Sequence, residues 1–248
     1  MEICKLKKDI LTFFYKDFKF YFQSKMMYLL VAVYVAMCGA ITFYSSDFFA
    51  NTTPNLYQFF KFQPGVMALI IPAITMRLWA DEYKQNTLEV ILGQPVSFIS
   101  IVLGKFLASW GVVGIMLIAS MPIWWSVAVF SNIDNHIVIM NYLIVFVMSG
   151  SLCALSFLVA SLCYNMIGAF LLGCMVCSML ISVSFKWLVN KFVPDNAIFM
   201  KVANAFNFSS QYNDMILGQI NLSSTLYFVL IMLFGLCLSV IAVDYKRN

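Results

Sequence analysis

Charged side chains are scarce in this sequence. Only 10% of the 248 residues are Asp, Glu, Lys or Arg, and there is a single histidine. Soluble domains carry roughly a quarter charged residues, so the chain lacks the polar surface that a fold in water requires. Apolar residues make up 62% of the sequence and give a mean hydropathy of +0.89. The composition therefore predicts an all-α integral membrane protein, because helices satisfy their own backbone within a bilayer.

Groups that perform catalysis or hold cofactors are also scarce. His136, the single histidine, falls in an expected outer loop, which excludes or nearly excludes histidine-based metal sites and triads. No Walker-type glycine loop occurs, so the chain does not bind ATP in that way. No acid or base lies near the centre of an expected span, which argues against proton-coupled transport, although sodium sites made of carbonyls escape this test. We expect no catalytic residue, metal or cofactor in this chain.

Seven cysteines do not form a disulfide framework by position. Most fall within apolar runs, where they read as small packing residues, and none falls in an expected outer loop. Cys174 and Cys177 form a C-x-x-C without redox or zinc context, so packing at i, i+3 is the better interpretation.

Long apolar runs predict six transmembrane helices. The second run contains Pro64 and Pro72, so we expect a bend there, and Pro122 can kink the third, which is too long for one straight crossing. The expected spans cover residues 27–44, 60–79, 97–127, 137–162, 166–187 and 225–243. Together they form one permease-like domain at 27–243, followed by a short tail at 244–248.

The first 26 residues predict a basic amphipathic helix along the inner membrane interface. Apolar residues share one helical face, and lysines occupy much of the rest. The apolar face holds Ile10, Phe13, Phe14, Phe18 and Tyr21, and the lysines are Lys7, Lys8, Lys16 and Lys19. Because these cations would lie beside an anionic leaflet, we expect contact with the lipid surface; a solvated tail is the alternative.

The distribution of Lys and Arg predicts the orientation. With the N-terminus inside, eleven of the fifteen basic residues fall on the inner side and four on the outer side. Cytoplasmic loops carry the excess of positive charge, so both termini are expected in the cytoplasm. Short helices are expected in the outer region 191–224, before the last span.

The inner segment from Arg77 to Lys105 is unusual. It begins with acids, continues with apolar residues from Leu88 to Leu92, and ends its polar part at Gly93 and Pro95. A solvated loop would be less apolar. The pattern favours a short amphipathic helix that lies against another protein.

The stretch Ile71–Ala108 resembles the permease subunits of type 2 ABC transporters, in the branch associated with gliding motility or copper processing. The motifs that carry the resemblance are Pro72, Met76-Arg77, Ala80-Asp81-Glu82, Thr87-Leu88-Glu89, Pro95-Val96 and Gly104-Lys105. Asp81 stands where glutamate is usual and keeps the charge. Asn86 stands where glycine is usual and tolerates a left-handed turn better than most residues. Weaker similarity extends over nearly the whole length, including Ser161–Phe170.

The resemblance implies a cytoplasmic coupling helix between spans 2 and 3, seated in a cleft of a separate ATP-binding subunit that holds ATP and Mg²⁺. It also implies a lid formed by the outer region before span 6. The implied contacts to the ATPase are Asp81, Glu82, Asn86, Thr87, Leu88, Glu89, Leu92 and Pro95, and the motif flanking them is Arg77, Gly104 and Lys105. Either glutamate could equally be a solvated charge.

The expected partners are the ATPase, a second permease chain and the lipid bilayer, with no nucleic acid. The expected location is a bacterial inner membrane. The leading function is the permease subunit of an ATP-driven exporter; the alternative is a non-transporting anchor for an ATPase in an envelope, motility or secretion assembly. An intramembrane enzyme is disfavoured by the missing acid and base groups. The many aromatic residues suit an amphiphilic cargo and lipid-facing helices equally.

Overall fold

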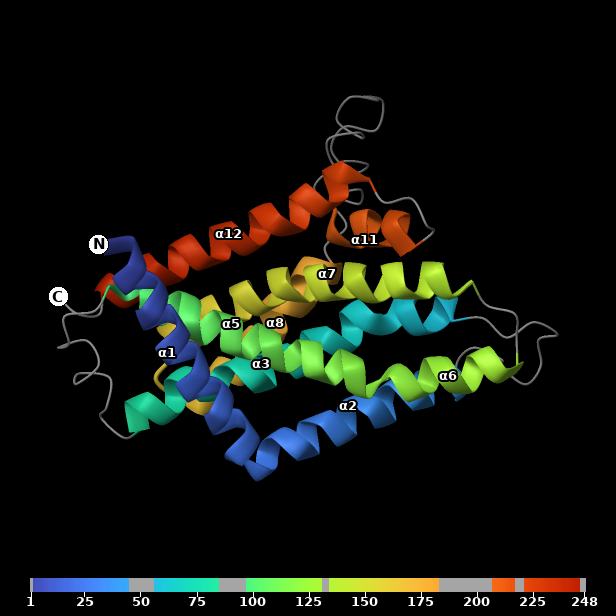
Figure 1. Cartoon of the computed structure of the whole chain (residues 1–248), viewed down its shortest axis with the longest axis horizontal. Coiled ribbons are helices and arrows are strands. Elements are labelled where there is room, and N and C mark those ends of the chain that lie inside the picture. The colour runs from blue at the N-terminus through green and yellow to red at the C-terminus, as the bar shows by residue number, and fades with distance from the viewer. Residues whose placement is uncertain are drawn as a thin grey trace.

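The computed structural model describes the backbone of residues 2–44, 56–84, 97–130, 134–182, 207–216 and 221–245; the side chains of 2–6, 80–84 and 130 are not described. Every regular element in these ranges is a helix. Figure 1 shows the long helices side by side, with α1 crossing them obliquely near one end of the bundle.

The helices within the described ranges follow the apolar runs of the sequence. They are α1 (Glu2–Gln23), α2 (Lys25–Tyr44), α3 (Tyr57–Lys84), α5 (Phe98–Ala119), α6 (Met121–Phe130), α7 (Asn135–Leu162), α8 (Met166–Ser182), α11 (Phe208–Ile216) and α12 (Leu222–Tyr245). Among the described residues, five stretches are long and apolar enough to cross a membrane: α2, Tyr57–Trp79 of α3, Phe98–Val129 of α5 and α6, α7, and α12. The chain is thus a multi-pass membrane protein by helix length and composition.

Two expected elements differ from the structure in detail. The expected third span, 97–127, is divided into two helices at Ser120. Pro122 lies two residues later, in the first turn of α6, where a helix tolerates proline. The expected fifth span, 166–187, is described only to Ser182 as α8, whose 17 residues make it shorter than the five other candidates. The count of six spans therefore stays a prediction.

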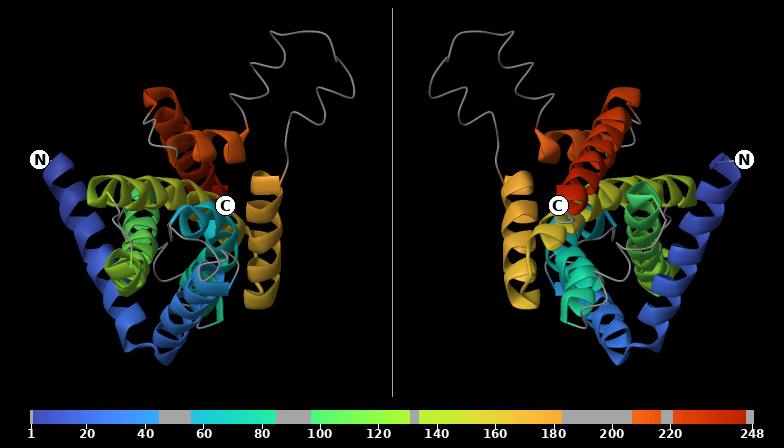
Figure 2. Two further views of the ribbon diagram at one scale, coloured as in Figure 1. Left: turned by 90° about the vertical axis from the view of Figure 1, so that its right-hand side faces the viewer. Right: turned by 90° about the vertical axis from the view of Figure 1, so that its left-hand side faces the viewer.

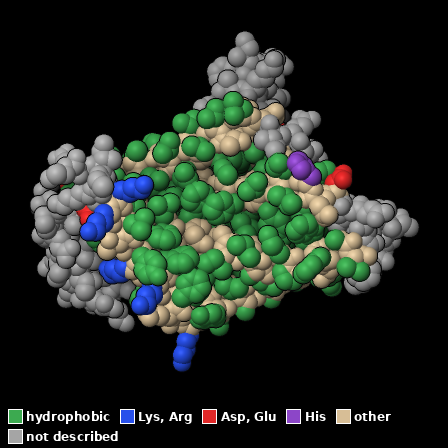
Figure 3. Space-filling view, viewed as in Figure 1, with side chains coloured by type: hydrophobic (Ala, Val, Ile, Leu, Met, Phe, Trp, Pro, Cys, Tyr) green, Lys and Arg blue, Asp and Glu red, His purple; other side chains and the backbone are tan. Residues whose placement is uncertain are grey.

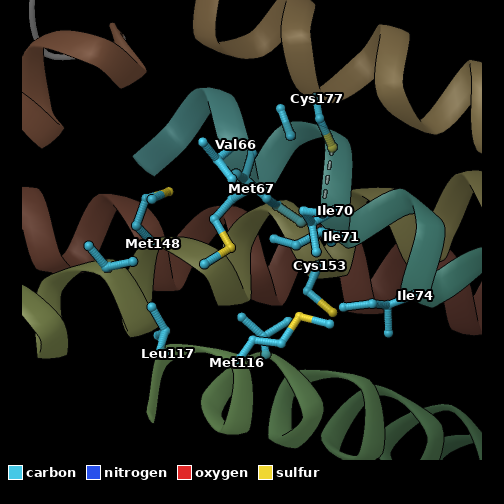
Figure 4. Packing of buried hydrophobic residues seen from close by; sticks show 14 of the residues in the cluster. Val66, Met67, Ile70, Ile71, Ile74, Met116, Leu117, Met148, Cys153 and Cys177 are labelled. Atoms are coloured by element: carbon cyan, nitrogen blue, oxygen red, sulfur yellow. Dashed lines mark hydrogen bonds between the residues drawn. The ribbon is translucent and has the colours of Figure 1, made fainter. Parts of the chain in front are cut away.

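Helix α7 lies at the centre and contacts α3, α5, α8, α11 and α12. Figure 4 shows the packing of Val66, Met67, Ile70, Ile71 and Ile74 of α3 with Met116, Leu117, Met148, Cys153 and Cys177 of α5, α7 and α8. Small residues permit the close approach: a Cβ on Gly235 would lie 3.1 Å from Cβ of Ala154, and one on Gly173 would lie 3.0 Å from Cβ of Pro72.

The described cysteines are free thiols, and Cys38, Cys153 and Cys177 are buried. Their position among apolar side chains agrees with the packing role predicted for them. Cys4 lies outside the described side chains.

A proline in α3 creates an attachment point for α11. Pro64 has no N–H to donate to the carbonyl of Phe60, four residues earlier. The hydroxyl of Tyr212 in α11 donates to that carbonyl at 2.6 Å, and both Tyr212 and Phe208 are buried. A side chain thus replaces the missing backbone donor, which holds α11 against the bundle end opposite α1 (Figure 1).

Uncharged polar side chains meet at the break between α5 and α6. The Tyr34 hydroxyl donates to Oε1 of Gln63 at 3.2 Å, and Nε2 of Gln63 lies 3.6 Å from Sγ of Cys38. The hydroxyl of Tyr142 lies 3.3 Å from Oγ of Ser120, whose side chain also interacts with Tyr34. We call these five residues the polar cluster. It joins α2, α3 and α7 to the interrupted span.

The arrangement of the ends is visible in both views of Figure 2. Helices α1 and α8 lie on opposite flanks of the bundle. The start of α1, the end of α3 and the end of α12 all lie at the same end of the molecule (Figure 1). The segment Arg77–Lys105 therefore begins and ends beside α1.

Candidate functional site

Helix α1 meets the end of α3 and the beginning of α5 in one contact region, which we call the α1 junction. It consists of Asp17, Tyr21, Ser24, Arg77, Trp79, Gly104 and Lys105. The apolar face predicted for α1 is turned toward this region, because α1 packs mainly on α5. The face that the sequence defines is therefore covered by protein.

Lys105 is the central charge of the junction. Its exposed fraction is 1%, and that of Asp17 is 5%. Its Nζ lies 3.6 Å from Oδ2 of Asp17, donates to the carbonyl of Leu78 at 3.2 Å, and lies 5.3 Å from the ring centre of Trp79. A buried ammonium needs such partners because its desolvation costs several kcal/mol. One side chain of α5 thus binds α1 and the last turns of α3 together.

Gly104 allows α1 to approach α5 closely. A Cβ at Gly104 would lie 2.6 Å from Cβ of Phe13 and 3.0 Å from the carbonyl oxygen of Ile10. Both atoms belong to or adjoin the backbone of α1, so they could not move without moving that helix. Gly104 and the adjacent Lys105 therefore both serve the contact with α1. The glycine leaves room for the helix, and the lysine binds the carboxylate of Asp17.

Two further hydrogen bonds fix α1 to α3. The Tyr21 hydroxyl donates to the carbonyl of Ile74 at 2.9 Å, and Nη1 of Arg77 donates to Oγ of Ser24. Ser24 lies between α1 and α2, so Arg77 holds the corner at which the chain turns toward the first span. Among the described side chains of the junction there are two cations, Arg77 and Lys105, and one anion, Asp17.

The structure places Arg77, Gly104 and Lys105 in the α1 junction, where Arg77 contacts Ser24 and Lys105 contacts Leu78 and Asp17. Asp81 and Glu82 lie in the last turn of α3, and their side chains are not described. Because α3 continues to Lys84, a separate helix can begin only after that residue. The other expected ATPase contacts lie outside the described residues; they are Asn86, Thr87, Leu88, Glu89, Leu92 and Pro95.

Sequence reasoning missed the partners of the motif in and beside α1. Asp17, Tyr21 and Ser24 carry no family motif that we identified. A signal was present, however: Asp17 is the one acid on the apolar side of the helix, three residues after Phe14 and four before Tyr21. An acid on an apolar stripe needs a buried cation, and Lys105 in its apolar run needs a buried anion.

The chemistry available at the junction is structural. In the searched part of the chain, no group of three or more His, Cys, Asp or Glu side chains could hold a metal ion. The junction instead joins α1, the end of α3 and the beginning of α5 through the contacts of Lys105.

A comparison with known protein families gives a match that includes this part of the chain. Residues 53–208 match the family described as CcmB protein. This chain belongs to the CcmB family. The match covers more than half of the 248 residues and includes α3, α5, α6, α7 and α8 with the segment between Arg77 and Lys105. CcmB-family chains are membrane permease components of ABC transporters. No curated protein matches the chain.

Proposed function

We propose that this CcmB-family chain is the membrane-spanning permease subunit of an ATP-driven exporter, and that a separate ATPase subunit hydrolyses the ATP. The family supports the permease role, and the long apolar helices support a pathway across a membrane. The absence of a Walker-type loop from the sequence supports a separate ATPase.

The α1 junction is the observation that carries the proposal. Arg77 and Lys105 flank the segment that would dock on the ATPase, and both are bound to α1 or its corner. A push on that segment would be passed directly to α3 and α5, because Lys105 also binds the carbonyl of Leu78. Closure of two ATPases around ATP would in this way tilt the bundles and open the pathway.

Specific residues would make the contact with the ATPase. Glu82 and Glu89 would supply charge, Leu88 and Leu92 would supply apolar anchors, and Asn86 with Thr87 would cap or bend the element. Asp81 and Pro95 would complete the contact. These roles come from the resemblance of Ile71–Ala108 to permease subunits of type 2 ABC transporters. The same resemblance is the basis for placing the chain in the branch associated with gliding motility or copper processing.

The proposed topology has six crossings, with α8 and residues beyond Ser182 forming the fifth. Both termini would then lie in the cytoplasm of a bacterial cell, with the chain in the inner membrane. The excess of Lys and Arg on the α1 side supports this orientation.

A second permease chain would complete the transporter, since one bundle forms half of such a pathway. Helix α2 supports this step. Ala32, Ala36 and Ala40 follow one another at four-residue intervals and are exposed, and a Cβ on Gly39 would meet nothing within 4 Å. Small residues at this spacing allow helices to pack closely within a membrane.

Co-purification tests the proposal. The full chain is expressed with an ABC ATP-binding subunit, and the complex is isolated through a tag on the permease. We expect Glu82→Ala with Leu88→Ala to abolish recovery of the ATPase, while Asp134→Ala with Ile137→Ala, at the opposite end of the bundle, leaves recovery unchanged. Full recovery and full ATPase stimulation with the first pair would contradict the docking segment. An intact complex that hydrolyses ATP without moving any cargo would favour the non-transporting anchor.

A further inference from the structure

Helix α1 has a second face, which points away from the junction. Six residues on one side of this helix line a shallow, open depression of its surface, which we call the groove: Lys7, Lys8, Leu11, Thr12, Tyr15 and Lys16. Lys8, Thr12 and Tyr15 lie on the side of α1 opposite Asp17, so the groove and the Lys105 contact use different faces of the same helix.

The groove combines positive charge with exposed apolar surface. Leu11 is 61% exposed and Tyr15 is 68% exposed, and they stand between lysines. The described lining contains three lysines and no acidic residue, and apolar atoms form most of its surface. Asp17, on the other side of the same helix, is turned to Lys105. This chemistry matches an amphiphile with an anionic head.

The groove also lies at the rim of the apolar surface. Figure 3 shows most of the visible Lys and Arg side chains toward one end of the molecule, with hydrophobic side chains spread over the middle of this face. Just beyond α1, Tyr28 and Leu29 of α2 are 61% and 58% exposed, and the Tyr28 hydroxyl donates to the carbonyl of Phe22 at 3.1 Å. Lysines that neighbour exposed apolar side chains such as Leu11 and Tyr15 can place their ammonium groups at the level of lipid headgroups.

We propose that this groove binds an anionic phospholipid from the leaflet on the α1 side. Lys7, Lys8 and Lys16 contact the phosphate and the headgroup, and Leu11 with Tyr15 contacts the beginning of the acyl chains. The bound lipid holds α1 in the orientation in which Asp17 meets Lys105. The consequence for ATPase coupling rests on the proposed function, whereas lipid binding does not.

Lipid binding can be measured directly on the purified full chain. The chain is reconstituted in nanodiscs of phosphatidylcholine, and phosphatidylglycerol is titrated while native mass spectrometry counts the retained lipid. We expect Lys7→Gln, Lys8→Gln and Lys16→Gln together to weaken phosphatidylglycerol binding by about 100-fold, since each lysine near an anionic surface contributes roughly a factor of five.

Two matched variants separate charge from folding. The triple lysine-to-arginine variant keeps the charge and should keep the lipid. Lys61→Gln removes an exposed lysine at the other end of α3 and should have no effect. An unchanged melting temperature shows that the triple glutamine variant is folded. Loss of the lipid by a folded arginine variant would overturn the assignment.

Other outcomes would also overturn it. These are equal retention of phosphatidylcholine and phosphatidylglycerol, unchanged binding in the glutamine variant, or displacement of the lipid by glycerol phosphate, which would identify a site for a soluble phosphate. If the glutamine variant keeps its lipid but releases the ATPase, the face is a subunit contact. A chain that binds phosphatidylglycerol but no ATPase would refute the proposed function and leave the lipid site standing.

Discussion

Nζ of Lys105 lies 3.6 Å from Oδ2 of Asp17, and this ion pair joins α5 to α1. Its two members are far apart in the sequence, and both are nearly inaccessible to solvent. A buried pair of this kind contributes more to specific placement than to net stability, because desolvation offsets much of the attraction. We therefore interpret it as the connection that holds α1 beside the segment after α3.

Removing one member of this pair should be costly. We expect Asp17→Ala to lower the free energy of unfolding by about 3 kcal/mol, because it leaves the Lys105 ammonium buried with fewer partners. Asp17→Leu combined with Lys105→Met should be closer to the wild type, since no charge remains buried. Unfolding in detergent micelles measures both, and purely additive effects of the two changes would contradict a direct pairing.

Gly104→Ala tests the close approach of α1. The new methyl group would lie 2.6 Å from Cβ of Phe13, so α1 must move away, and we expect a loss of about 1–3 kcal/mol. Gly65→Ala in α3 is the matched control, because its methyl group meets nothing within 4 Å. Limited proteolysis within α1 reports the displacement. Equal proteolysis rates for the two variants would show that α1 does not depend on this contact.

Tyr212→Phe should loosen α11. The change leaves the carbonyl of Phe60 without the donor that replaces the N–H absent from Pro64, and we expect a cost of about 1–3 kcal/mol. In a Pro64→Ala background the same change should cost less, because alanine restores the backbone N–H at that position. A thermal-shift cycle over the four proteins measures this coupling, and equal costs in both backgrounds would exclude it.

Tyr212 should also make the stability of the fold depend on pH in the alkaline range. Burial raises the pKa of Tyr212 well above its ordinary value of 10.0. The folded state therefore keeps the proton where the unfolded state loses it, so the contribution is fully present below pH 10 and declines as the pH rises above it. Tyr212→Phe should show a smaller loss of melting temperature between about pH 9 and pH 11. Identical losses in both proteins would place the sensitivity elsewhere.

Loss of the Gln63 side-chain amide should destabilise the packing of helices at the polar cluster. Gln63→Leu removes the acceptor of the Tyr34 hydroxyl and the contact with Cys38, and each hydrogen bond between membrane helices contributes about 0.6 to 1.7 kcal/mol. Ser178→Ala on α8 is the control, since that hydroxyl donates to the nearby carbonyl of Met175 in its own helix. Comparable melting temperatures for the two variants would show that the cluster does not hold the helices together.

The spans were predictable from the sequence because an apolar run longer than about 18 residues is long enough to cross a bilayer as a helix. Helix α7, expected at 137–162, occupies Asn135–Leu162. Pro122 predicted an interruption of the third span, and the chain breaks two residues earlier, at Ser120, because the proline lies inside the first turn of α6. Periodicity also identified the apolar face of α1 correctly, since Tyr21 is buried.

The partners of that face could not be predicted. Helical periodicity states which side of α1 is apolar, but lipid and protein cover apolar side chains equally well. Only the carboxylate of Asp17, which lies among apolar residues, indicated that protein and not lipid covers this face. Its pairing with Lys105 and not with another cation depends on how α1 crosses α5. The motif that contains Gly104 and Lys105 was recognised, yet its contact with α1 emerged only in three dimensions.

The most direct test of the account is where the ATPase touches this chain. A photo-crosslinking residue placed at Leu88 should attach covalently to the co-expressed ATPase on illumination. The same residue placed at Trp125, which is 78% exposed on α6 at the opposite end, should not. An ATPase cross-link from position 88 alone is the predicted result. No cross-link from position 88 in an intact complex, or an equal one from position 125, would contradict the assignment of the segment between Arg77 and Lys105.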